Sequence, residues 1–164
     1  MLDGYAILGP VKKKGEHMVK KTVTYKDYND VERTETFYFD FSEAEVMDMQ
    51  TSKFNGFNEY LQSIINEKDP SKIIKTFKEL VLSAYGEKSE DGRSFIKEAP
   101  DGTKLADRFK QTKAYSDIYM ELALDAKAAA EFVNNVFPPN MAETIKKYET
   151  RSGNENVVPM MPNA

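Results

Sequence analysis

The stretch from Tyr85 to Pro139 most constrains the fold, because signals that start and stop helices follow one another at short intervals. An Asp-Gly turn at 91–92 and the apolar pair Phe95-Ile96 lead into this helical region. The spacing of apolar side chains then predicts three short amphipathic helices. These helices are expected over 104–110, 113–124 and 126–136, with Thr112 and Asp125 as caps and Pro138-Pro139 as the stop.

Two further helices are predicted before this stretch. Apolar residues recur with helical spacing over 57–66, and Asp69-Pro70 then supplies a cap and a first-turn proline for a helix over 71–84. We expect Gly86 to end that helix in a left-handed cap. The expected buried face of helix 71–84 consists of Ile73, Ile74, Phe77, Leu80, Val81 and Ala84.

The N-terminal part of the chain has the alternation of a β-hairpin. Strand-forming residues at 22–25 and an alternating segment at 31–41 flank the turn residues 27–30. In the second strand Phe37, Phe39 and Phe41 share one face, which must cover something, because an isolated hairpin is marginal in water. Ser42 and Glu45 form a capping-box pattern that predicts a helix over 43–49.

These elements indicate an α+β fold, mostly α. We expect an N-terminal β-hairpin packed on a bundle of five to seven short helices, with the helices of 109–136 and the phenylalanine face in one core. The expected organisation is an N-terminal extension over 1–18, a single domain over 19–140, and a short helix with a disordered tail over 141–164. Residues 1–17 are either a natural, weakly ordered extension or an added or upstream-start segment.

Composition argues against most chemical functions. The 164 residues carry a net charge of −4, which does not favour nucleic acid, and the cluster Lys12–Lys14 with Lys20 and Lys21 is interpreted as a solvated flank. No cysteine is present, and His17 is the one histidine. Neither a catalytic pair nor a transition-metal site is therefore expected. We predict a non-enzymatic protein without cofactor or metal, and without a membrane span or signal sequence.

Five residues are candidates for binding a partner: Tyr115, Tyr119, Met120, Phe95 and Ile96. Tyr115 and Tyr119 lie at i and i+4, so they form either an aromatic recognition edge or a packed pair with hydroxyls at the rim. Phe95-Ile96, inside a charged connector over 87–102, is also suited to pin that loop to the core. Four methionines fit either an adaptable partner surface or gaps in the core, namely Met47, Met49, Met120 and Met141.

The order of these parts resembles the tail assembly chaperones of tailed phages of Gram-positive hosts. The similarity covers the strand pair at 23–46, the helix pair at 57–86, and most specifically YGEKSEDGRSFIK at 85–97 with FKQTKAYSDIYMELALDAKAAAEFVNNVFP at 109–138. It implies a chaperone that coats the helical tape measure protein and keeps it soluble until tail tube subunits assemble. It also implies residence in the host cytoplasm, absence from the mature virion, and a frameshift-extended form as a further partner. Self-association is a separate hypothesis that the sequence leaves open.

Three alternatives stay open at this point. A small acidic inhibitor, an anti-defence protein that binds a host factor, would share the size, the charge and the lack of catalytic groups. A structural component of the virion would be found in purified particles, unlike a chaperone. An enzyme of unknown type would require an activity that no residue pattern in the chain suggests.

Overall fold

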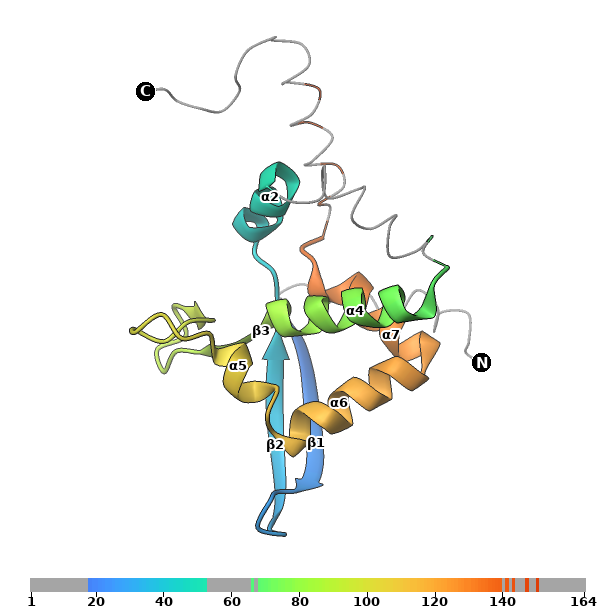
Figure 1. Ribbon diagram of the computed structural model, residues 1–164. Helices are drawn as coiled ribbons and strands as arrows, with labels where there is room; N and C mark the ends of the chain where they lie inside the picture. The colour runs from blue at the N-terminus through green and yellow to red at the C-terminus, as the bar shows by residue number, and fades with distance from the viewer. Residues whose placement is uncertain are drawn as a thin grey trace.

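A computed structural model describes residues 18–52, 66, 68–139, 141, 143, 147 and 150. Within these residues four strands form one antiparallel sheet in the order β1-β2-β3-β4 (Figure 1). Two of the described helices lie between β2 and β3 in the chain, and three follow β4. The strands are β1 (Val19–Lys26), β2 (Glu32–Phe39), β3 (Tyr85–Lys88) and β4 (Phe95–Ile96). The helices are α2 (Glu43–Ser52), α4 (Pro70–Ala84), α5 (Leu105–Phe109), α6 (Lys113–Leu124) and α7 (Ala126–Val136).

The predicted hairpin is confirmed as β1 and β2. The two strands pair antiparallel over eight residues each, from Val19 opposite Phe39 to Lys26 opposite Glu32. The Asp27 carboxylate fixes the turn by accepting the backbone N–H groups of Asn29 and Val31. Asp30 completes the turn at a φ of 62°, which an aspartate tolerates better than most side chains.

The sheet is larger than the sequence predicted. Two more strands, β3 and β4, replace the expected polar connector after α4, and the chain passes directly from helix to strand at Tyr85. The prediction that Gly86 forms a left-handed helix cap is wrong, because Gly86 lies within β3 and only Gly92 and Gly102 have positive φ among the described glycines. Gly86 is small for a different reason: a Cβ there would lie 2.6 Å from Cε2 of Phe95.

The N-terminal helix caps predicted from the sequence are confirmed. Asp69 accepts the N–H of Ser71 at the start of α4, Thr112 accepts that of Tyr115 in α6, and Asp125 accepts those of Lys127 and Ala128 in α7. These oxygens satisfy amides that a helix start leaves without partners. The capping box of α2 is also present, since Ser42 and Glu45 bond each other's backbone N–H.

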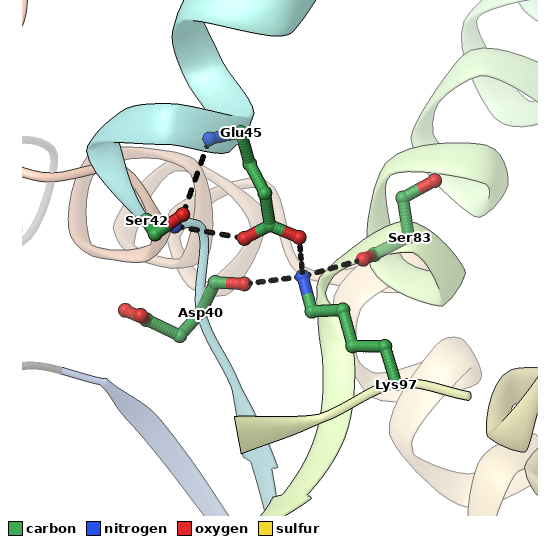
Figure 2. Close-up of polar contacts among 5 residues, drawn as sticks. All are labelled: Asp40, Ser42, Glu45, Ser83 and Lys97. Carbon is green, nitrogen blue, oxygen red and sulfur yellow. Dashed lines mark hydrogen bonds and ion pairs between the residues drawn. The ribbon is translucent and has the colours of Figure 1, made fainter. Parts of the chain in front are cut away.

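Lys97, directly after β4, joins three separate segments at the base of α2. Its Nζ donates to the carbonyl of Asp40 at 2.8 Å, to Oε2 of Glu45 at 2.8 Å and to the carbonyl of Ser83 at 2.9 Å (Figure 2). The ammonium also lies 4.6 Å from the ring centroid of Phe41. Glu45 thus caps α2 with one oxygen and holds Lys97 with the other, which connects the end of β2, the end of α4 and the start of α2.

One hydrophobic core joins the sheet to the helices. This confirms the prediction that the helices of 109–136 and the phenylalanine face of the hairpin share a core. Phe39 is fully buried, and its ring makes edge contacts with Tyr85, Phe109 and Phe132, at centroid distances of 5.9, 5.9 and 5.4 Å. Phe41 is buried as well and stacks on Phe137. Next to this cluster α6 lies against β1, and Lys21 Nζ contacts Glu121 at 2.6 Å.

Some predictions differ from the structure, and others concern residues outside the described part of the chain. Ile74, predicted to be buried in α4, is 48% exposed, because it lies at the edge of the stripe formed by Phe77, Leu80 and Val81. The α2 helix extends to Ser52, beyond the predicted end at 49. Most of the predicted helices over 57–66 and 141–149, and the segment 1–17, lie outside the described residues.

Tyr25 makes the stability of the hairpin sensitive to alkaline pH. Its hydroxyl donates to Oε1 of Glu35 at 2.7 Å, and this bond, followed by burial, raises the pKa of Tyr25 from 10.0 to about 12. Because the folded pKa is raised, this contribution to stability is present below about pH 10 and lost as pH rises toward 12. Between about pH 8 and about pH 11, urea unfolding should therefore show a larger loss of stability for the wild type than for Tyr25→Phe. Equal losses in the two proteins would contradict this role.

Candidate functional site

An apolar groove lies between α4, α6 and α7. Its volume is about 540 Å³, and its lining is almost entirely hydrophobic. The lining side chains come from all three helices: Ile73, Ile74 and Phe77 of α4, Tyr119, Leu122, Ala123 and Leu124 of α6, and Ala126, Ala129, Ala130, Val133 and Asn134 of α7.

The groove exists because alanine side chains leave space between the helices. The groove is lined by four of them, at positions 123, 126, 129 and 130, and a methyl side chain fills little of the space between helices. Asp125 sets the junction that brings them together, since it ends α6 and caps α7 within one residue. Larger hydrophobic residues flank this floor, so that an incoming side chain would contact apolar surface on several sides.

The edge of the groove exposes large hydrophobic side chains. Leu124 is 77% exposed and Ile74 48% exposed, and both line the groove. Met120 lies one helical turn before Leu124 and is 45% exposed. Hydrophobic side chains gathered around a hollow, rather than scattered singly, are typical of a surface that binds a partner.

The five partner-binding candidates predicted from the sequence lie on different elements of the structure. Tyr119 lines the groove, and Met120, the next residue of α6, is exposed but is not among the lining residues. Tyr115 is buried in the core, where its ring stacks on that of Tyr119 with the centroids 5.8 Å apart. Its hydroxyl has no hydrogen-bond partner within the described part of the chain, and burial raises the pKa of that hydroxyl. Phe95 and Ile96 lie on β4 and are not among the residues that line the groove.

The methionines also divide between two roles. Met141 is buried, and Met47 and Met49 pack against the core, which fits the interpretation as gap fillers. Met120 alone of the four is exposed. The exposure of Met120 favours the partner-surface interpretation for this residue.

Sequence reasoning missed most of the groove. Leu124 falls outside the buried stripe of α6, and Ile74 is displaced to one side of the stripe of α4. An apolar residue beside a complete core stripe is the signal that could have found them. The alanines of α7 carry no such signal, because alanine is common in helices wherever they lie.

The described residues contain neither a group of potential metal ligands nor a candidate membrane-spanning helix. No group of three or more histidine, cysteine, aspartate or glutamate side chains in the described ranges could hold a metal ion. Within these same ranges, no helix has the length and hydrophobicity needed to cross a bilayer. The groove is therefore the feature of the described structure that best fits a binding function.

Comparison with known proteins gives one family. Searches among curated proteins and among solved structures each returned no match. A family model described as phage tail assembly chaperone matches residues 18–161, which is most of the chain and includes all of the described elements. The chain therefore belongs to the phage tail assembly chaperones.

Proposed function

We propose that the groove between α4, α6 and α7 binds apolar faces of helices in the tape measure protein, and that this binding keeps the client soluble during tail assembly. The family match supports the chaperone role. The observation that carries the choice of surface is the alanine-floored groove with Leu124 and Ile74 exposed along its edge, and with Met120 exposed one helical turn before Leu124. The family match also favours this role over the inhibitor hypothesis.

The shape and lining of the groove fit a helix better than an extended segment. A helix that docks in an apolar groove uses side chains at i, i+3, i+4 and i+7, and it satisfies its own backbone hydrogen bonds. The lining offers little hydrogen bonding in return, since Asn134 and the hydroxyl of Tyr119 are its polar side-chain groups. Binding through hydrophobic contact alone is also tolerant of sequence, which suits a chaperone that covers many sites on one long client.

The protein then acts by binding, without turnover of any substrate. In this proposal it works in the host cytoplasm, alone or with a frameshift-extended form, and leaves before the virion matures. Mass spectrometry of purified particles checks the last point. A stoichiometric amount of this chain in mature particles would contradict the proposal and favour a structural component.

Leu124→Glu is the sharpest test of the groove. Leu124 is 77% exposed, so the substitution should leave the fold intact while placing a carboxylate at the edge of the groove. We expect wild-type protein to keep a co-expressed tape measure fragment in the soluble fraction and Leu124→Glu to lose most of that effect. Burial of the unpaired carboxylate against an apolar helix is the physical reason.

Two further variants serve as controls. Tyr28→Glu changes a side chain that is 74% exposed at the tip of the hairpin, and it should solubilise the fragment as well as wild type. Ile96→Glu tests the competing surface on β4, which the sequence nominated. If Ile96→Glu abolishes solubilisation and Leu124→Glu does not, the groove is the wrong surface.

A further inference from the structure

The strand β2 is paired along both edges only at its end. On one side β1 pairs with every residue from Glu32 to Phe39. On the other side β3 pairs only with Tyr38 and Phe39, and its next residues, Glu87 and Lys88, pair with β4 instead. The segment Glu32–Phe37 therefore has one edge that no strand in the described part of the chain occupies (Figure 1). Such an edge can template pairing with another strand.

A cleft lies where β2 and β3 diverge. Its volume is about 550 Å³, and it is lined by residues 35–38 of β2 and residues 85–89 in and after β3. A strand added along the open edge of β2 would run toward this cleft and end in it, because Tyr38 is already paired with Gly86.

We propose that the open edge of β2 pairs antiparallel with the same edge of a second copy of this chain, with Thr34 opposite Thr34. Two-fold symmetric antiparallel pairing must be centred on one residue, because residues that face each other lie on the same face of the sheet. Centring on Thr34 places Arg33 opposite Glu35 of the other copy, twice. Centring on Arg33 or on Glu35 would instead place like charges opposite each other, which is unfavourable.

The neighbouring pairs fit the same register. Val31, 50% exposed at the end of the turn, would lie opposite Phe37 of the other copy, at the cleft. On the opposite face, the hydroxyls of Thr24 and Thr34 are 2.8 Å apart, as are those of Thr22 and Thr36. The Thr34–Thr34 pair would continue this row of threonines across the two copies.

Arg33 and Glu35 each have side-chain atoms left to form an ion pair with the second copy. Arg33 contacts Oδ2 of Asp27 through Nε at 2.6 Å, which leaves the terminal N–H groups of its guanidinium for another carboxylate. Glu35 accepts the Tyr25 hydroxyl through Oε1, which leaves Oε2. This pairing is independent of the apolar groove, which lies between α4, α6 and α7.

A single cysteine tests the register. The chain has no cysteine of its own, so Thr34→Cys introduces the only thiol. Directly opposed residues of an antiparallel pair have Cα atoms about 4.5–5.5 Å apart, within reach of a disulfide. We expect Thr34→Cys to form a disulfide-linked dimer rapidly under mild oxidation. Thr36→Cys, on the same face but opposite Glu32, should link far more slowly, and equal rates would overturn this register.

Charge reversal tests the interface itself. Light scattering with size exclusion should show a concentration-dependent dimer for wild type and at least a roughly tenfold weaker dimer for Arg33→Glu or Glu35→Arg. Mixing these two variants should restore the dimer, because the introduced glutamate of one copy then faces the introduced arginine of the other. The native Glu35 and Arg33 that remain also face each other in the mixed dimer. Loss of a contact within one chain could not be repaired by mixing.

Three results would overturn the proposal. They are a wild-type protein that stays monomeric at every concentration, dimers that survive both reversals, and dimers lost in the single variants but not restored by mixing. If the monomeric wild type pairs this edge only with an added client fragment, the occupant is an extended client segment and not a second copy.

Discussion

Phe39→Asp is expected to yield insoluble or unfolded protein. Phe39 is fully buried at the centre of the core, where its ring contacts Tyr85, Phe109 and Phe132. Loss of a buried phenylalanine side chain alone costs about 3–5 kcal/mol. An unpaired carboxylate in the same position adds a desolvation cost, so the total approaches or exceeds the roughly 5–15 kcal/mol that stabilises most domains.

A control on the same hairpin distinguishes the effect of burying an aspartate from the effect of placing an aspartate in a strand. Thr24 is exposed on the outward face of β1, so Thr24→Asp should cost no more than about 1 kcal/mol. Circular dichroism during thermal unfolding of the soluble fraction provides the measurement. A soluble Phe39→Asp protein that melts cooperatively would show that Phe39 does not occupy the core described here.

Lys97→Met is expected to produce the second largest effect, centred on α2. The substitution keeps most of the side-chain length but removes the ammonium that bonds Asp40, Glu45 and Ser83. Hydrogen bonds to charged groups contribute roughly 1.5–3 kcal/mol each, less where water can replace them, so we expect a loss of about 3 kcal/mol in total. Part of the loss arises because two backbone carbonyls are left with less hydrogen bonding.

Hydrogen exchange can locate that loss. We expect faster exchange in α2 and β4 than in α6 and α7, because Lys97 joins the base of α2 to the sheet while the other helices are held by the core. Glu45→Gln should have a smaller effect, since an amide oxygen can still accept the Ser42 N–H. Lys104→Met, which replaces an exposed lysine shortly after Lys97 in the chain, is the matched control. Uniform loosening of the whole protein would contradict a local role for Lys97.

The elements that could be predicted from the sequence are those with local causes. Asp69, Thr112 and Asp125 cap helices at the predicted positions because a cap bonds amides two or three residues away. The hairpin was predictable because its turn and its alternation lie within one short stretch. The phage tail assembly chaperone family was likewise identifiable from the order of the segments, and the family model confirms it.

The strands β3 and β4 were not predictable in this way. They have four and two residues, too few for alternation to be visible, and β3 exists because Tyr85 and Gly86 meet the end of β2. Gly86 was assigned the wrong role for the same reason. Its position after a helix suggested a cap, whereas the structure requires it small because Phe95 packs against it from the next strand.

Sequence alone therefore determined the helices α2, α4, α5, α6 and α7 of the described part of the chain, where most of them begin, and which phenylalanine face is buried. Only the tertiary structure decided that Ile74 and Leu124 lie at an open groove and that Lys97 joins three segments. It also decided that one edge of β2, apart from Tyr38 and Phe39, has no partner strand within the described part of the chain. The physical reason is the sequence separation between the residues that interact. Caps, turns and apolar stripes act between residues a few positions apart, whereas a groove, a strand edge or a shared ammonium depends on segments brought together by the whole fold.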